Sequence, residues 1–230
     1  GRFESLNRKN VTAFCKKYGV SENVFFLTAY NLSIGLFSNE KDTVSSSIHS
    51  GRTDSRWNRL AGPLFLTYFF RCTEEKDQTV PELLKKNGKQ IMDTMRCYIS
   101  NLHADEMFFQ YQGDIVNLNT VGGYPAKREH LQLDSLPFHL QVFTDDRGYY
   151  YELRYWENRF DTLQLQNFME VMECLMDAMQ EETLVRRLKR YLPDKLFPLH
   201  YTILVEALNQ EARGQLVSGV DGKEQIKEYV

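Results

Sequence analysis

The chain has 230 residues, of which 42% are hydrophobic and 13% aromatic, so it can bury a substantial core. Its formal net charge is −3, which argues against nucleic acid or an anionic membrane as a partner, because such binding relies on excess Lys and Arg. The first ten residues are polar and the longest apolar stretch, around residues 24–37, is interrupted by polar residues, so we expect a cytoplasmic protein without signal peptide or membrane span.

The first forty residues predict two helices. Apolar residues at positions 11, 14, 15 and 18 repeat at helical spacing, and Gly19 is a typical helix end. Ser21 is a suitable N-cap for a second helix, which should run from Glu22 to about Phe37. Because this second segment is apolar on nearly every side, we expect a helix that is buried all round.

Two strands and a third helix are predicted next. Residues 43–49 alternate weakly, and residues 64–71 are apolar on both faces, which is typical of a strand in the centre of a covered sheet. The segment Thr79-Val80-Pro81-Glu82 matches a capping box with an early proline. A helix should therefore follow it to about Ile99.

The pattern over residues 138–155 predicts a hairpin, because two alternating segments flank the turn at residues 145–148. Asp161 and Gln164 form a second candidate capping box, ahead of a helical stripe that ends near Glu181. Interleaved helices and strands predict an α/β fold, a mixed β-sheet with helices packed on it. The basic, proline-broken composition from Leu184 onward suggests a boundary there.

Motifs that would carry chemistry are scarce. The five histidines form no HExxH or HxH pattern and the four cysteines form no CxxC pair, so we predict no metal site and expect free thiols. The sequence contains no GxSxG, no GxxxxGK[ST] and no GxGxxG that opens a helix, which leaves hydrolase, P-loop and Rossmann functions unsupported. The residues by themselves therefore predict a domain without a complete catalytic constellation.

Several segments between about residues 8 and 182, taken in order, resemble the C-terminal half of a condensation domain of nonribosomal peptide synthetases. The helix VFFLTAYNLSIGLFS, the strand and Gly-Arg turn DTVSSSIHSGR, the strand FFQYQGDIV and the stretch YYYELRYWENRFDTLQLQNF resemble family segments. AGPLFLTYFFR resembles the motif (I/V)GxFVNTxxxR, and YISNLHADEMF resembles HQDxPFE. The matched motif positions are Gly62, Thr67, Arg71, His103 and Asp105.

The resemblance implies one lobe of a two-lobed fold of the CoA-dependent acyltransferase type, also called chloramphenicol-acetyltransferase-like. Residues 1–183 would be the C-terminal lobe, and residues 184–230 a linker or the start of a following domain. The family joins an aminoacyl group to an acyl or peptidyl donor, both held as thioesters on phosphopantetheine arms of carrier proteins. The implied partners are the N-terminal condensation lobe, peptidyl carrier proteins and an adjacent adenylation domain, with no cofactor bound directly.

The resemblance also implies roles for individual residues, although it assigns no catalytic residue to this chain. The second histidine of the family's HHxxxDG motif is usually assigned to catalysis, and this motif is absent here, so the chain alone should be inactive. Arg52 would reach across the cleft to the motif's Asp, since a bidentate guanidinium suits that task; alternatively it caps a loop in solvent. The positions expected in the substrate tunnel or between the lobes are Arg52, Gly62, Leu66 and Thr67, and those expected to be structural are Gly51, Arg71, His103 and Asp105.

Departures from the family pattern keep other interpretations open. Leu66 stands where the motif has Asn, and the RDxSRNPL segment is missing, which favours a degenerate lobe that holds carrier proteins or a neighbouring domain without chemistry. An epimerisation domain is a third possibility, against which Pro63 and Arg71 argue. An HHxxxDG motif upstream in the full protein would favour the amide-forming role, and its loss would favour the scaffold.

Overall fold

The computed structural model describes residues 1–50, 56, 65–96, 107–113, 120–121, 124–125, 136–181 and 184–192. The helices are α1 (Arg8–Tyr18), α2 (Glu22–Ser38), α3 (Val80–Arg96), α4 (Thr162–Glu181) and the 3-10 helix η3 (Val185–Tyr191). The strands are β1 (Asp42–His49), β2 (Leu66–Thr73), β3 (Met107–Gly113), β4 (Thr120–Val121), β5 (Tyr124–Pro125), β6 (Phe138–Asp145) and β7 (Gly148–Tyr155). The predicted α/β class, a mixed sheet with packed helices, is confirmed.

The ends of the first two helices lie close to the predicted positions because local signals specify them. Gly19 ends α1 with a left-handed φ of 68°, a conformation that glycine adopts without strain. The Ser21 hydroxyl accepts a hydrogen bond from the backbone N–H of Val24, 3.3 Å away, and so caps α2. Residues 24–37 of α2 are all buried, as the apolar pattern predicted.

The two predicted caps downstream are present as well. Thr79 and Glu82 form a reciprocal capping box at α3: the Thr79 backbone N–H donates to the Glu82 carboxylate (2.9 Å), and the Glu82 N–H donates to the Thr79 hydroxyl (3.3 Å). At α4 the Asp161 carboxylate accepts from the backbone N–H groups of Leu163 (2.9 Å) and Gln164 (3.2 Å).

The main sheet has five strands in the order β2-β1-β3-β6-β7. β1 and β6 run parallel to β3, while β2 pairs antiparallel with β1 and β7 antiparallel with β6. The prediction that residues 64–71 form a central strand is wrong, because β2 lies at one edge of the sheet that the described strands form. Its alternate residues Tyr68, Phe70 and Cys72 are buried, whereas Phe69 on the other face is only half-buried and Arg71 is exposed.

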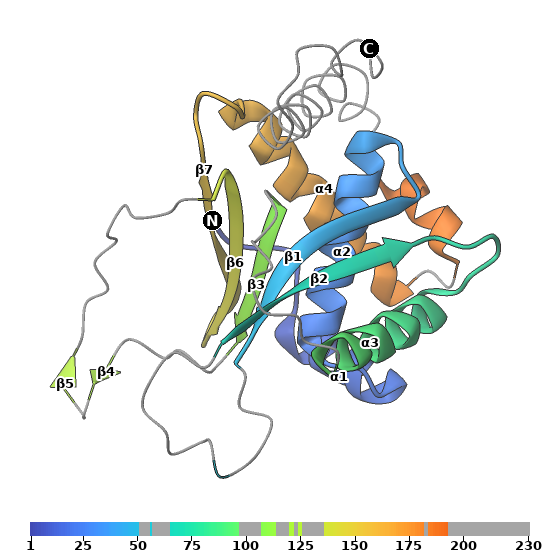
Figure 1. Ribbon diagram of the computed structural model, residues 1–230, viewed down its shortest axis with the longest axis horizontal. Helices are drawn as coiled ribbons and strands as arrows, with labels where there is room; N and C mark the ends of the chain where they lie inside the picture. The colour runs from blue at the N-terminus through green and yellow to red at the C-terminus, as the bar shows by residue number, and fades with distance from the viewer. Residues whose placement is uncertain are drawn as a thin grey trace, which may run out of the picture.

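The helices cover one face of this sheet (Figure 1), where α2 contacts β1, β2 and β3 as well as the helices α1, α3 and α4. Tyr30 of α2 shows how the layers join: its ring lies 5.2 Å from Phe109 of β3, 6.1 Å from Phe138 of β6 and 5.9 Å from Phe168 of α4. Such aromatic contacts carry much of the buried apolar area of the core. None of the helices that the structure describes is long and apolar enough to cross a membrane.

The described segment after α4 packs on the same core. Val185, Leu188 and Leu192 are buried with the core residues, and the Val185 N–H donates to the backbone oxygen of Gln78 (3.0 Å). Arg186 forms an ion pair with Asp77 at 2.9 Å. The chain beyond residue 192 lies outside the described residues, so the nature of residues 184–230 stays a prediction.

Buried polar contacts join α2 to the sheet. The Asn31 amide donates to the backbone oxygen of Leu27 (3.0 Å) and to the Ser45 hydroxyl of β1 (2.8 Å), and the Thr43 hydroxyl lies 3.3 Å from the Asn31 side-chain oxygen. All three side chains are at most 7% exposed. Because a strand displaced by one residue would separate these groups, the contacts help to specify the register of β1 under α2.

Replacing Asn31 with leucine should therefore lower the free energy of unfolding by about 1–3 kcal/mol, because the Ser45 and Thr43 hydroxyls would lose a buried partner. Chemical denaturation followed by circular dichroism measures the change. Ser33→Ala is the matched control, since that hydroxyl is equally buried but donates only within its own helix, to Ala29 at 2.9 Å. Equal losses in the two variants would show that the link to β1 contributes little.

Candidate functional site

The face of the sheet that points away from the described helices, called the open face below, is the candidate functional site. Side chains alternate along a strand, so alternate residues of each strand reach this face. The cross-strand register places residues of β3, β6 and β7 in adjacent rows there. The residues of these rows are Phe108 and Gln110 of β3, His139, Gln141 and Phe143 of β6, and Tyr150, Glu152 and Arg154 of β7.

The first row on the open face combines an aromatic ring, an imidazole and a guanidinium. Phe108 lies beside His139 with ring centroids 4.8 Å apart at an interplanar angle of 89°, and Arg154 is the partner of His139 on β7. His139 is only 7% exposed. An imidazole is therefore held nearly out of solvent on a face that the described helices leave uncovered (Figure 1).

The second row consists of three polar side chains, two of which form a hydrogen bond with each other. The Gln141 amide donates to the side-chain oxygen of Gln110 at 2.7 Å, and Glu152 is the β7 partner of Gln141. Glu152 and Arg154 form an ion pair at 3.6 Å, which connects this row to the first. Gln141 is 8% exposed. Since buried polar groups are costly unless they are matched, this row is a feature that an ordinary packed sheet face does not require.

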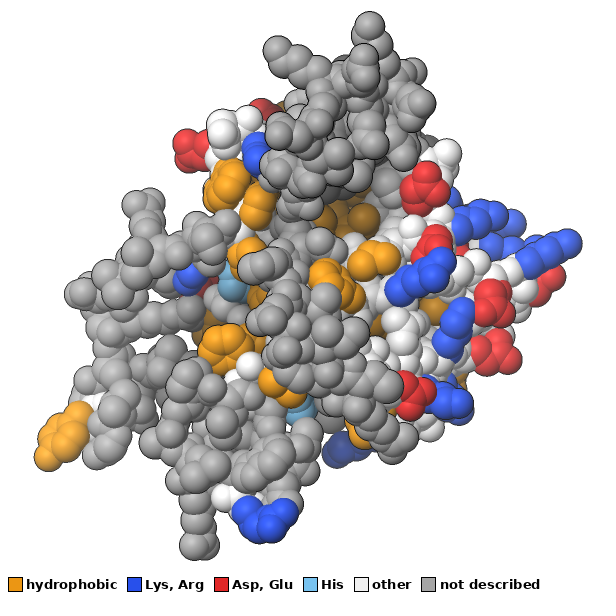
Figure 2. All heavy atoms as spheres, in the orientation of Figure 1, with side chains coloured by type: hydrophobic (Ala, Val, Ile, Leu, Met, Phe, Trp, Pro, Cys, Tyr) orange, Lys and Arg blue, Asp and Glu red, His pale blue; other side chains and the backbone are white. Residues whose placement is uncertain are grey.

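A third row closes the open face at the hairpin end. The rings of Phe143 and Tyr150 stack with centroids 5.1 Å apart, and the Arg2 guanidinium lies 5.5 Å from the Tyr150 ring centroid. Arg2 also binds the Asp145 carboxylate through both terminal nitrogens, and this hydrogen-bonded partner lowers the pKa of Asp145. In the space-filling view hydrophobic and histidine side chains lie over the sheet, whereas charged side chains gather at the right (Figure 2).

The opposite edge of the sheet, formed by β2 and β1, carries the predicted site residues that the structure describes. Leu66 pairs with His49 and Thr67 with Ile48 at the start of β2, and both are half-buried. Burial lowers the pKa of His49, because desolvation disfavours its charged form.

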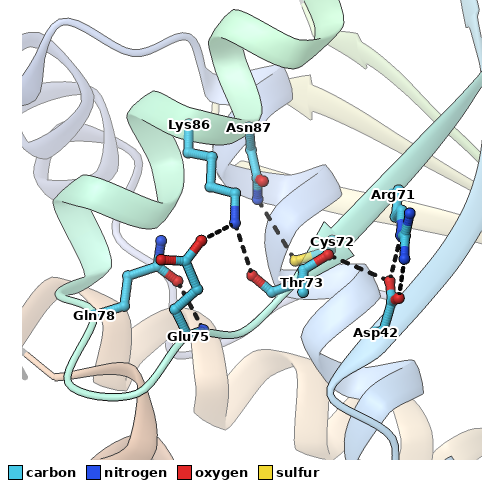
Figure 3. Close-up of polar contacts among 8 residues, drawn as sticks. All are labelled: Asp42, Arg71, Cys72, Thr73, Glu75, Gln78, Lys86 and Asn87. Carbon is cyan, nitrogen blue, oxygen red and sulfur yellow. Dashed lines mark hydrogen bonds and ion pairs between the residues drawn. The ribbon is translucent and has the colours of Figure 1, made fainter.

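Arg71, predicted to be structural, lies in an exposed ion pair. Its Nε donates to Asp42 Oδ1 at 2.8 Å and a second nitrogen binds Oδ2, which lowers the pKa of Asp42 (Figure 3). The same close-up shows α3 bound to this edge, where the Asn87 amide contacts the sulfur of Cys72 at 3.5 Å. Arg71 therefore binds a residue of the neighbouring strand β1, although the two residues are 29 positions apart in the sequence.

The remaining predicted positions, Gly51, Arg52, Gly62, His103 and Asp105, lie outside the described residues.

A comparison with models of protein families assigns the chain to a family. The profile of the condensation domain matches residues 2–194, most of the chain. The chain belongs to the condensation domain family. No curated protein matches it.

Solved structures share the fold of this condensation-family chain. A four-domain nonribosomal peptide synthetase bound to AMP and glycine matches with a TM-score of 0.62 and 12% identity over 75% of this chain and 16% of that one. The epimerization domain from the third module of tyrocidine synthetase B matches at 0.60 and 14% over 76% and 46%. The EpoB cyclization-docking bidomain from Sorangium cellulosum matches at 0.61 and 12% over 79% and 41%.

These comparisons confirm the predicted resemblance at the level of family and fold. The chain spans less than half the length of each of these three structures. Because the similar structures include an epimerization domain and a cyclization bidomain, the shared fold does not by itself separate these chemistries. Which reaction this condensation-family chain takes part in therefore depends on the residues of its site.

The polar rows of β3, β6 and β7 were not among the predicted site residues. The alternation of Phe138, Leu140 and Val142 with His139 and Gln141 indicated a strand, but it gave no reason to assign a function to the polar positions. The rows exist only because β3 pairs with β6 in one register, which joins Gln110 to a residue 31 positions away. The pattern within a single segment does not indicate such a long-range pairing.

The thiols that the structure describes are poorly suited to nucleophilic chemistry. Burial raises the pKa of Cys15 to about 12 and that of Cys72 to about 12, and it also raises the pKa of Cys174, so all three thiols remain protonated near neutral pH. Among the described residues no three His, Cys, Asp or Glu side chains gather in a way that could hold a metal ion. Of the described groups, the aromatic, amide and charged side chains of the open face are the candidates for binding and positioning, and Phe108, His139, Gln141 and Phe143 among them are at most 8% exposed.

Proposed function

We propose that this chain is the C-terminal lobe of a condensation domain, which forms an amide bond between two carrier-bound thioesters and is inactive without its N-terminal lobe. The observation that carries the proposal is the match of the condensation domain profile to residues 2–194. The chain spans 46% of the epimerization domain of tyrocidine synthetase B, which supports a second lobe of comparable size.

In this reaction the amine of the aminoacyl thioester attacks the carbonyl carbon of the acyl or peptidyl thioester. The new C–N bond replaces the C–S bond, the donor's pantetheine sulfur leaves as a thiol, and the amine gives up a proton. A base within hydrogen-bond reach of the amine assists this proton transfer. Under the proposal that base belongs to the other lobe, and this chain contributes substrate positioning.

The open face supplies groups suited to that positioning role. Phosphopantetheine arms and peptidyl groups carry amides, and amide side chains such as those of Gln110 and Gln141 can both donate and accept hydrogen bonds. Phe108 and His139 provide flat surfaces beside them. Under this proposal the partners are the N-terminal lobe, peptidyl carrier proteins that deliver the phosphopantetheine arms, and a neighbouring adenylation domain.

Amide formation by the full-length protein and by this chain alone tests the proposal. Each is incubated with loaded donor and acceptor carrier proteins, and product is measured by mass spectrometry. We expect product from the full-length protein and none from the chain alone. Product from the chain alone would contradict the requirement for a second lobe.

A second candidate is a degenerate lobe that binds carrier proteins without chemistry. The observation that favours it is Leu66, a half-buried apolar residue at the start of β2 where the family motif has a hydrogen-bonding Asn. Carrier binding by the full-length protein without any amide product would support this candidate and reject the first.

A further inference from the structure

The exposed face of α1 is strongly basic. Four of the eleven residues of this helix are Lys or Arg and none is acidic, although the whole chain has a net charge of −3. Val11 and Cys15 are buried against the core, and the exposed side chains are Lys9, Asn10, Ala13, Lys16 and Lys17. The lysines thus surround a small residue, Ala13, at the middle of the exposed face.

Two hollows flank this face and make α1 a ridge between them. One has a volume of about 870 Å³ and lies between α1 and the β6–β7 turn, and the other, of about 690 Å³, lies between α1 and α4. Ser5, Asn7 and Ala13 line both hollows. A ridge with a groove on each side is the shape that a second helix can pack against.

The two hollows differ in charge. The hollow at the β6–β7 turn is lined by four basic residues, Arg8, Lys9, Lys16 and Arg147, and by Glu4, Asp145 and Asp146. Arg2, which does not line the hollow, binds the Asp145 carboxylate, so the negative charge of Asp145 is largely matched. The hollow at α4 is lined by Asp177 and Glu181 and by no Lys or Arg. The charged side chains that line the hollow at the β6–β7 turn are therefore mostly basic, and those that line the hollow at α4 are acidic.

We propose that the exposed face of α1 is a docking surface for an acidic helix of a partner protein. Its carboxylates would lie on the β6–β7 side, where Lys9 and Lys16 meet them, and away from the acidic residues of α4. Ala13 has no long side chain to hold the two helices apart. Charge complementarity of this kind mainly sets orientation and association rate. The inference does not depend on amide formation, since binding at α1 can be measured without it.

The probe is a short, fluorescently labelled helical peptide with glutamates repeated one turn apart, titrated with the full chain at low salt and followed by anisotropy. We expect the Lys9→Gln/Lys16→Gln variant to bind it about tenfold more weakly than the natural chain. Lys85→Gln/Lys89→Gln is the control: it removes the same charge from two exposed lysines on α3 and should leave binding unchanged.

Three results would overturn the proposal: equal weakening by the two lysine pairs, undiminished binding by the α1 variant, or equal affinity for the same peptide with glutamines in place of glutamates. A charge exchange gives an independent check. The Lys9→Glu/Lys16→Glu variant should reject the glutamate peptide and bind its lysine counterpart, whereas loss of both would contradict a docking surface selected by charge. Asp177→Asn/Glu181→Gln should not weaken binding of the glutamate peptide, and a tenfold loss there would also overturn the proposal.

Discussion

Replacing Phe168 with alanine is expected to lower the free energy of unfolding by about 3–5 kcal/mol, which would be the largest effect of a single core substitution considered for this chain. Phe168 of α4 is fully buried, with its ring centroid 5.9 Å from Tyr30, 5.5 Å from Phe37 and 5.7 Å from Phe138. Its removal leaves a cavity where α2, α4 and β6 meet. Urea unfolding followed by circular dichroism measures the loss.

Leu163→Ala is the matched control for this experiment. Leu163 lies on the same helix but is 54% exposed, so its truncation should change stability by no more than about 0.5 kcal/mol. If Phe168→Ala cost no more than the control, α4 would contribute little to the core, in conflict with the burial of its inner face.

Replacing Arg52 with alanine in the full-length protein is expected to cost about 3 kcal/mol or more, because an acidic residue of the other lobe would lose its buried partner. This expectation follows from the family resemblance, since Arg52 lies outside the described residues. Amide formation should be lost with the distorted motif loop, while carrier binding should persist. Thermal unfolding, product formation and carrier binding are measured on the same preparations.

Arg71→Ala provides the comparison, because Arg71 pairs with Asp42 on an exposed edge of the sheet. An exposed ion pair contributes little to stability, so this variant should keep its activity. If Arg52→Ala left both stability and amide formation unchanged, Arg52 would be a solvated loop residue. The inactivity expected of the chain alone would be unaffected by that result, because it rests on the absent HHxxxDG motif.

The helices were predictable from sequence to within a few residues, because the interactions that begin and end them are local. Ser21 caps α2 through Val24, and Thr79 caps α3 through Glu82, each three residues along the chain. The hairpin of β6 and β7 was predictable for the same reason, since its strands are joined by a short turn. In each case the chain segment contains both partners of the decisive contact.

The position of β2 was not predictable in this way. Its apolar residues suggested a central strand, but strand order depends on which strands meet, and β2 meets only β1 in the described sheet. An apolar residue such as Phe69 can be half-buried at an edge as readily as buried in a centre. Composition therefore indicated a strand without indicating its place in the sheet.

By itself the sequence determined the α/β class, the end of α1, the bounds of α2, the capping residues of α3 and α4, and the family resemblance, because these rest on short-range periodicity, capping and motif order. Only the tertiary structure decided that β2 is an edge strand and that Gln110, His139, Gln141 and Arg154 meet on one face of the sheet. The physical reason is that parallel pairing joins β3 to β6 across an intervening segment, so the neighbours of each polar side chain are set by long-range register rather than by adjacent residues.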